Sequence, residues 1–445
     1  MKTPSHALGL GISGLAALLF LVAGHLDPAA EPVPDRDHRD TVFQDALRML
    51  REGRQTFRFD TFGDEEFWGG TLRLHEAIAG AAHGGVGPGL SPVDALAAGL
   101  KVDQEALSRG LLNLIKRGRV DLNDPAVTLE LLRRDAVVGV TGFFDTEDRL
   151  VSLGIQCALC HSTVDDDSAP GIGRRLDGWA NRDLDVGAVV NLSPDLSSVA
   201  DLLGVAESTV REVLTSWGPG KFDAALLLDG LAFAPGGGSG ATLIPPAFGL
   251  AGVNLHTSTG WGSATHWNAF VANIEMHGKG TFIDPRLDDA KQFPVAAANG
   301  FGHIRNDPDL VTSKLAALQF YQLALVAPAP PAGSFDPLAA QRGDELFGNK
   351  ARCAECHVAP LFTEPGWNLH RPEEIGIDDF QASRSPDRGY RTTPLKGLWT
   401  HARGGFYHDG RFATLDQVVD HYDQFLALAL TAQEKADLVQ YLLSL

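Results

Sequence analysis

Apolar residues recur at helical spacing along most of the chain, and this pattern predicts the main elements of its fold. Three of the six predicted helices start at a Ser or Thr whose side chain can accept a backbone N–H of the first turn, and two end at Gly. One apolar run, 137–140, fits either a short buried strand or a loop. Three predicted helices span 103–117, 199–217 and 339–347. Three more start at Ser91, Thr414 and Thr431.

The helix that starts at Thr414 carries an apolar stripe that also contains an aromatic hydroxyl. At helical spacing, Tyr422 shares one face with Leu415 and Val419. We therefore expect Tyr422 to point into the core, with His421 at the edge of the stripe.

The boundaries follow from composition. The Pro-rich segment 327–334 is a stiff linker. It separates an enlarged N-terminal domain, 41–326, from a short C-terminal domain, 335–445. The predicted fold class is mainly α, with two cytochrome c-like domains joined by long loops.

The N-terminus has the features of an export signal. Residues 1–24 begin with Met1 and Lys2 and continue through an apolar segment to small residues that suit cleavage. An uncleaved membrane anchor is the alternative, because the apolar segment is of borderline length for a span. Either way we expect a periplasmic or secreted protein, with the Pro- and Asp-rich residues 25–40 as a tether.

The chain of 445 residues has a formal net charge of -19, and this charge limits the kinds of partner that the protein can bind. Nucleic-acid binding needs clustered Lys and Arg, and no such cluster occurs, so we expect no nucleic-acid partner. The acidity fits a solvated surface that can also steer a basic redox partner.

The strongest chemical signal is a C-x-x-C-H motif that occurs twice and uses all four cysteines. This spacing is typical of covalent haem c attachment, in which two thiols form thioethers and the following His binds the iron. The first copy predicts attachment through Cys157 and Cys160, with His161 as axial ligand. The second predicts attachment through Cys353 and Cys356, with His357 as axial ligand, and the alternative is a chance match on structural cysteines.

Two further groups of residues are candidates for contacts with a haem. Arg174 or Arg175 could pair with a haem propionate, although a solvated Arg is the simpler alternative. The stretch 256–282 is dense in aromatic and His residues that either line a haem pocket or pack in a core.

With both motifs and the Pro-rich joint in place, the chain resembles the bacterial di-haem cytochrome c peroxidase superfamily. The resemblance is carried mainly by three C-terminal motifs, 391–395, 406–410 and 413–415, and covers roughly the last 110 residues. The superfamily includes di-haem peroxidases, the enzymes that mature the cofactor of methylamine dehydrogenase, and rubber oxygenases. The two motif histidines lie 196 positions apart, which is closest to the rubber-oxygenase branch.

The resemblance implies roles for several side chains. It implies Trp267 between the haems and Phe282, fifteen positions later, over the open first haem. Where the peroxidases have a Met ligand to the second haem, fourteen positions after His408, this chain has Tyr422. We therefore expect a low-potential His357/Tyr422 site, with His421 or His408 as fallback ligands.

The resemblance also implies a calcium ion between the haems. The loop from Thr400 to His408 is longer than in the family and lacks the usual Pro, which argues against that ion.

Together these features predict an exported di-haem oxidoreductase, in which the first haem activates peroxide or dioxygen and the second transfers or stores electrons. Its expected partners are a small redox protein, peroxide or dioxygen, and an organic substrate that the sequence does not identify. The alternative is a di-haem electron carrier without a substrate site. The enzyme is favoured because a carrier does not need some 300 residues around one haem.

Overall fold

The computed structural model describes residues 36–445, which fall into two compact units with a division after Arg48. Residues 49–445 form the second unit, which holds both C-x-x-C-H motifs. The predicted export signal, 1–24, lies outside the described residues, and so does most of the predicted tether. The end of that tether, 36–40, is helical. No helix between residues 36 and 445 combines the length and the apolar character needed to cross a bilayer.

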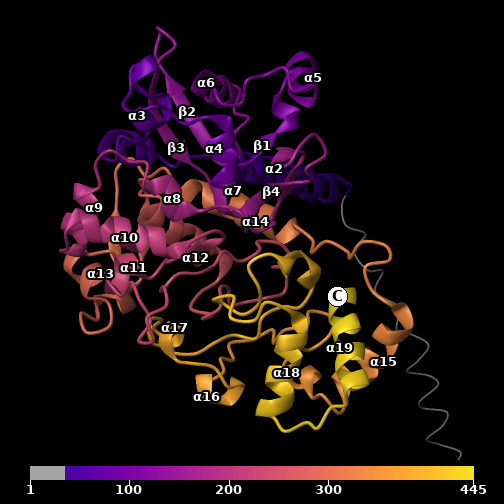
Figure 1. Cartoon of the computed structure of the whole chain (residues 1–445). Coiled ribbons are helices and arrows are strands. Elements are labelled where there is room, and N and C mark those ends of the chain that lie inside the picture. Colours follow the sequence, from indigo (N-terminus) through magenta and orange to yellow (C-terminus); the bar gives the residue numbers. More distant parts are fainter. Residues whose placement is uncertain (1–35) are drawn as a thin grey trace, which may run out of the picture. The chain divides into compact units, whose positions relative to one another are not determined.

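Helices dominate the part of the chain that precedes the first motif (Figure 1). Ser91 starts a helix as predicted, since its side chain accepts the backbone N–H of Asp94. The helix predicted over 103–117 is shorter, because Leu107 is extended and Ser108 caps a new start. The helices here are α2 (Arg36–Phe59), α3 (Leu74–Ala79), α4 (Pro92–Ala97), α5 (Arg109–Lys116) and α6 (Pro125–Arg133), with a π-helical turn η1 (Glu66–Thr71).

The strands are short and pair two by two, so no extended sheet forms among the described residues. The pair β1 and β5 is parallel and the other four pairs are antiparallel. The longest pair, β2–β3, leads directly into the first motif. The strands are β1 (Val102–Asp103), β2 (Val140–Phe144), β3 (Leu150–Ile155), β4 (Ser162–Val164), β5 (Ile172–Gly173), β6 (Arg175–Asp177), β7 (Lys221–Phe222), β8 (Thr242–Leu243), β9 (Thr281–Ile283) and β10 (His303–Arg305).

A second group of helices follows the first motif. The helix predicted over 199–217 is two helices, because Gly204 has a φ of +66° and ends the first of them. The helices of this group are α7 (Ala158–His161), α8 (Val186–Val190), α9 (Ser197–Leu203), α10 (Glu207–Trp217), α11 (Leu226–Asp229), α12 (Ala264–Phe270), α13 (Pro294–Asn299) and α14 (Leu315–Ala324), with a π-helical turn η4 (Val271–Glu275) after α12.

The C-terminal segment packs α15 against α19, with α18 beside them (Figure 1). The predicted helix 339–347 lies within α15, and the predicted capping box of Thr431 and Glu434 opens α19. Gly343 permits the close approach of α15 and α19, since a Cβ there would collide with the carbonyl of Asp437. The helices are α15 (Pro337–Gly348), α16 (Pro372–Ile375), α17 (Phe380–Ser383), α18 (Leu415–Phe425) and α19 (Ala432–Ser444).

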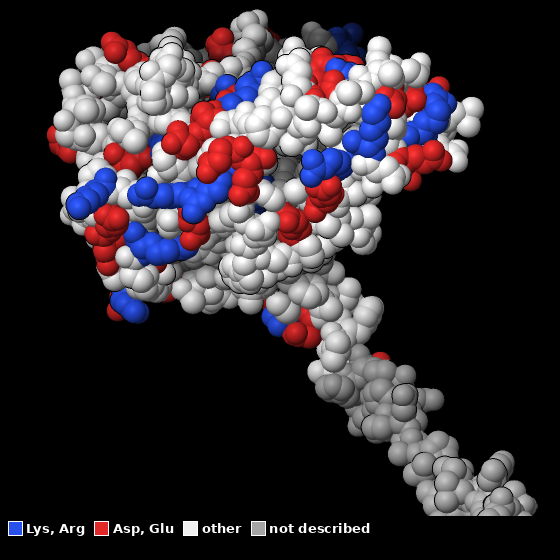
Figure 2. Space-filling model, turned by 90° about the horizontal axis from the view of Figure 1, so that it is seen from below, with Lys and Arg blue, Asp and Glu red and all other residues white. Residues whose placement is uncertain are grey.

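The mainly α fold class is thus confirmed. Separate apolar clusters surround the two motifs: Leu159 packs in the largest one and Cys353 against the C-terminal one. The Pro-rich segment 327–334 joins two parts of one compact unit and does not divide it. On the face in Figure 2, acidic and basic side chains interleave and do not form a single acidic patch.

Candidate functional site

The first motif is held by the end of the β2–β3 hairpin and by the short helix α7. Gly139, with a φ of +80°, lies so close to Leu159 that a Cβ would collide with the backbone of α7. The carbonyl of Cys160 accepts the backbone N–H of Asn181 at 2.8 Å, and that of His161 accepts the N–H of Gly178 at 2.8 Å. The backbone of the motif is therefore fixed on both sides.

The imidazole of His161 is oriented by a backbone carbonyl. Its Nδ1 lies 3.0 Å from the carbonyl oxygen of Pro245. Burial lowers the pKa of His161, so the ring is neutral and its one proton belongs on Nδ1. This leaves the lone pair of Nε2 for a metal, which is how metal-binding histidines are usually held.

The second motif repeats this arrangement in a different local fold. Cys353 opens the 3₁₀ turn η7 (Cys353–Glu355). The Nδ1 of His357 lies 3.0 Å from the carbonyl oxygen of Phe362, and burial lowers the pKa of this imidazole too. Both motif histidines therefore present a free Nε2.

Both motifs open into one cavity of about 880 Å³, at the large end of the range for small-molecule sites. The wall includes the sulfur atoms and imidazoles of both motifs and is otherwise mostly apolar. The residue types, the free Nε2 atoms and the apolar wall fit haem c at each motif. The six motif side chains on this wall are Cys157, Cys160, His161, Cys353, Cys356 and His357.

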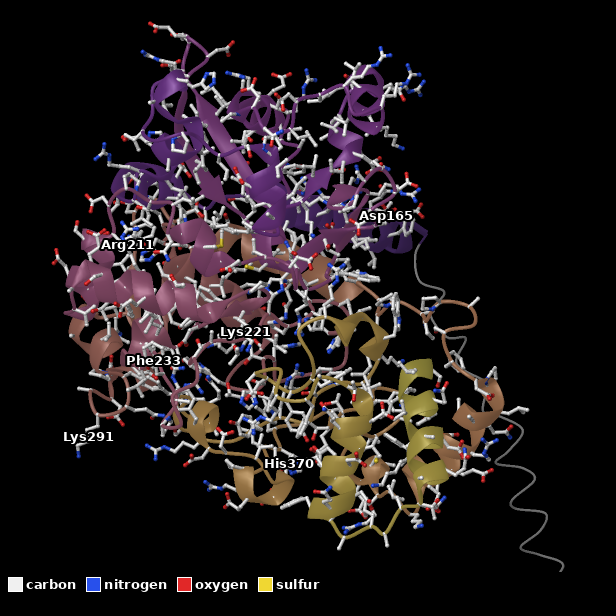
Figure 3. All side chains as sticks on the ribbon, viewed as in Figure 1. Asp165, Arg211, Lys221, Phe233, Lys291 and His370 are labelled. Carbon is white, nitrogen blue, oxygen red and sulfur yellow. The ribbon has the colours of Figure 1, made fainter. Side chains whose placement is uncertain are left out.

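The other uses of a C-x-x-C pair, a redox-active thiol pair and a metal site, fit the structure less well than haem attachment does. All four cysteines are free thiols, and burial raises the pKa of Cys157 and Cys160 to about 12, opposite to the lowered pKa of a reactive redox thiol. Within the described residues, one group of side chains could hold a metal: Cys356, Glu364 and His370 (Figure 3 labels His370). A metal there would compete with the haem for Cys356.

The candidate ligands of the second haem do not all face the cavity. Tyr422 and His408 line it, whereas His421 does not. The Nε2 of His421 lies 3.1 Å from the carbonyl oxygen of Ile375, and its ring stacks on Phe425. His421 is therefore a poor fallback ligand in this geometry.

Tyr422 stands beside a second tyrosine. The ring centroids of Tyr407 and Tyr422 are 6.3 Å apart, and the two hydroxyls lie close enough for each to affect the pKa of the other. Burial raises the pKa of Tyr422, with a further contribution from Cys353 and Cys356, which places its hydroxyl near the second motif.

The two aromatic residues implied by the resemblance have different surroundings. Trp267 lines the cavity, and its buried indole N–H has no partner among the described residues. Phe282 is buried behind Phe270, with ring centroids 5.7 Å apart, and is not on the cavity wall. The packing of Phe282 thus matches the alternative of a core residue, and its role at the first haem stays a prediction.

Sequence reasoning missed an acid on the cavity wall. Glu275 ends η4, and neither of its buried carboxyl oxygens has a hydrogen-bond partner in the described chain. Burial raises the pKa of Glu275 well above its usual value, and the nearby Asp223 makes a smaller contribution in the same direction. The carboxyl also acts on the pKa of Cys160, so it lies near the first motif. An isolated acid within the apolar run 271–276 was the available signal.

Neither of the arginines considered as propionate partners faces the cavity. Arg174 is exposed and pairs with Asp165 at 2.7 Å, at the edge of the molecule, where Figure 3 labels Asp165. Arg175 pairs with Asp103 at 2.8 Å in the core. Neither lines the cavity, whereas Arg182 does.

A buried ion group joins the C-terminal segment to the residues around the first motif. Arg384 bonds Asp229 at 2.7 Å and Asp223 at 3.0 Å, and each of the three side chains is almost fully buried. Burial raises the pKa of Asp223 to about 7 despite the arginine. Since Asp223, Arg384 and Glu275 all line the cavity, the acids of this region are coupled.

Comparison with known proteins agrees with this site. No family model matches the chain. Over 205 residues it is 27% identical to methylamine utilization protein MauG of Methylorubrum extorquens, a match that covers 40% of this chain and 54% of that protein. Over 227 residues it is 28% identical to cytochrome-c peroxidase IdrP1 of Denitromonas iodatirespirans, covering 39% and 59%. These matches support the resemblance of the matched region to the di-haem cytochrome c peroxidase and MauG superfamily.

These relatives imply c-type haem as the cofactor of the two motifs. The chain spans a little over half the length of the curated relatives that it matches. A solved MauG-like protein associated with microbial copper homeostasis is 19% identical, with a TM-score of 0.32, over 49% of this chain and 76% of that one. That likeness is too small to show a shared fold.

Proposed function

We propose that the chain is an exported di-haem c oxidoreductase of the peroxidase type. The observation that carries this proposal is the cavity, onto which two C-x-x-C-H motifs open with both Nε2 atoms free, together with a buried, unpartnered acid. When bound, the two haems would supply one-electron chemistry at iron and an open coordination position for peroxide or dioxygen.

The residues around the first motif handle protons. Reduction of peroxide to water consumes two protons for two electrons, so a proton source is needed inside the apolar cavity. Glu275 is suited to this role, since burial raises its pKa well above the usual value and so favours the protonated carboxyl. Asp223, with a pKa of about 7, is the next acid along the wall and can return a proton to Glu275.

The residues around the second motif favour electron storage. Tyr422 would hold the iron of the second haem together with His357, because it lines the cavity near the motif cysteines and residues 335–445 contain no Met. A phenolate ligand holds the iron at a lower potential than Met does. Met276 packs against Ala158 of the first motif, so it is not a candidate ligand for the second. A sulfur-to-iron charge-transfer band in the oxidised protein would contradict this assignment.

Trp267 is proposed to carry charge between the two sites, as an oxidisable indole on the cavity wall. The expected partners are a small redox protein and peroxide or dioxygen, and we leave the organic substrate unnamed. Acidic and basic side chains alternate on the face of Figure 2, so charge there does not choose between an acidic and a basic redox partner.

The proposal is tested on mature protein produced with haem maturation. Denatured protein should carry two haem masses, and carbon monoxide should bind the reduced protein at one iron. Two haems with no carbon monoxide binding would favour a di-haem electron carrier, and a mass without haem would exclude both functions. Steady reduction of peroxide with a reduced cytochrome as donor should accompany carbon monoxide binding.

A further inference from the structure

Arg182 carries a buried positive charge without a counter-ion. Its Nε and Nη1 atoms are shielded from solvent and have no hydrogen-bond partner among the described residues. Burial lowers the pKa of this guanidinium to about 10, and no acidic neighbour offsets the effect. Such a cost is unusual, because buried charges are normally paired.

Three buried arginines among the described residues follow that rule, whereas Arg391 on the cavity wall has no acidic partner and donates instead to the backbone carbonyls of Leu255 and Thr257. Arg58 bonds Asp177 at 2.6 Å, Arg175 bonds Asp103 at 2.8 Å, and Arg384 bonds two aspartates. The acid next in sequence to Arg182 is already engaged, since Asp183 pairs with Lys101 at 2.6 Å and also with Arg403. Arg182 therefore differs from these arginines in having its unpaired donors on the cavity wall.

Three neighbours approach Arg182. A Cβ at Gly220 would lie 2.7 Å from the backbone carbonyl oxygen of Arg182, and one at Gly404 would lie 3.3 Å from its Nη1, so the backbone of the C-terminal segment passes close to the guanidinium. The third neighbour is His401, a cavity residue whose pKa is lowered to about 3 by burial and by Arg182. A neutral imidazole and a guanidinium thus face the cavity together and can bind an anion.

We propose that Arg182 binds a carboxylate inside the cavity, namely a propionate of one of the two haems. A guanidinium has the planar donor geometry that a carboxylate matches, and an apolar cavity strengthens that contact. Arg182 follows the first motif by 21 residues, and its neighbour Asn181 bonds the carbonyl of Cys160, whereas Gly404 and His401 come from the C-terminal segment. The carboxylate can therefore come from either haem, and the test separates the two sources.

The test compares R182Q, R182K and R174Q with the unsubstituted chain, all matured with haem and checked for two haem masses. The midpoint potential of each haem is measured by optical redox titration. Loss of the guanidinium charge should lower the potential of one haem in R182Q, because oxidised iron is then opposed by less positive charge. R182K should show a smaller shift at the same haem. R174Q, the same change at an exposed paired arginine, should leave both potentials unchanged.

The haem whose potential falls identifies the propionate that Arg182 binds. Unchanged potentials of both haems in R182Q, with two haems attached, would overturn the inference. If R182Q matures with one haem missing, peptide mapping of the empty motif identifies the same partner, whereas equal loss from both motifs would overturn it. The inference rests on the proposed di-haem function, but the two can be told apart. If the unsubstituted chain carries no haem, both the proposed function and the role of Arg182 are excluded. If the potentials of haem-loaded R182Q are unshifted, only the role of Arg182 is excluded.

Discussion

The two motif regions share one device and differ in what surrounds it. In each, a backbone carbonyl 3.0 Å from Nδ1 fixes the imidazole and frees Nε2. Around the first motif the cavity wall carries the buried carboxyl groups of Glu275 and Asp223, whereas around the second it carries the phenols of Tyr407 and Tyr422, and its carboxyl groups, Glu355 and Glu374, are exposed.

This difference indicates a division of labour. Buried carboxyl groups with raised pKa hold and release protons, which peroxide reduction consumes. Buried phenols with raised pKa do not supply protons near neutral pH, and Tyr422 would release its proton only on binding an iron that exchanges electrons. Two haems attached in the same way could thus serve different tasks. The side chains around each motif would decide whether it handles protons or exchanges only electrons.

The largest expected effect comes from removing the acid of the first region. E275Q keeps the size of the side chain but cannot release a proton, so the rate of peroxide reduction should fall by roughly 100- to 10,000-fold, the usual contribution of a general acid or base. E212Q is the matched control, because Glu212 is exposed on α10 and should leave the rate unchanged. The rate is measured by stopped flow with both haem contents verified. An E275Q rate equal to that of E212Q would remove the contrast between the regions.

A smaller effect concerns the pH dependence of stability. Folded Glu275 keeps its proton well above 4.5, the pKa expected when it is exposed in the unfolded chain. Between these two values the folded state binds more protons than the unfolded state, so the free energy of unfolding decreases as pH rises, by about 1.4 kcal/mol per pH unit.

E275Q lacks this contribution, and it should gain stability relative to the unsubstituted chain as pH rises from 5. Asp223 titrates in both proteins, so its contribution largely cancels in the difference. Urea unfolding at a series of pH values, followed by circular dichroism, measures the two slopes. Parallel slopes would mean that Glu275 is not held protonated in the folded protein.

Sequence was sufficient where local chemistry decides the structure. The spacing of the C-x-x-C-H motifs, the capping residues Ser91 and Thr431, and the inward face of Tyr422 each depend on neighbours within a few positions. The helix limits were predicted less well, because Gly204 and Leu107 end or interrupt helices that the apolar pattern alone would continue.

Sequence was insufficient where the site depends on contacts between distant segments. The neighbouring residues in the sequence do not distinguish Arg182 from Arg174. Only the tertiary fold places Arg182 on the cavity wall and pairs Arg174 with Asp165. Glu275 could be noticed as an acid in an apolar run, but its isolation from any donor depends on the packing of η4 against the cavity. Phe282 shows the reverse: spacing suggested a cavity role, and Phe270 occupies the position between it and Trp267.

The smallest expected effect tests the link between the two regions. Trp267 lies on the cavity wall, 5.2 Å from Trp261 between ring centroids, and an indole is more easily oxidised than a phenyl ring. W267F conserves most of the volume but raises the oxidation potential of the ring. If Trp267 relays charge, transfer to the second haem after peroxide is added should slow about fivefold or more, equivalent to roughly 1 kcal/mol of barrier.

Packing alone predicts a different outcome for the same substitution. W217F is the control, because Trp217 is a buried indole on α10 that packs on Phe222 and does not line the cavity. A purely structural tryptophan should lose stability on substitution, as W217F should, with unchanged transfer in haem-loaded protein. If W267F slows transfer while its unfolding midpoint falls no more than that of W217F, the effect is electronic and the two regions are coupled through this ring. If transfer is unchanged, charge passes between the motifs by another route. The loop 255–261 is one such route, because Arg391 of the C-terminal segment donates hydrogen bonds to its carbonyls at Leu255 and Thr257.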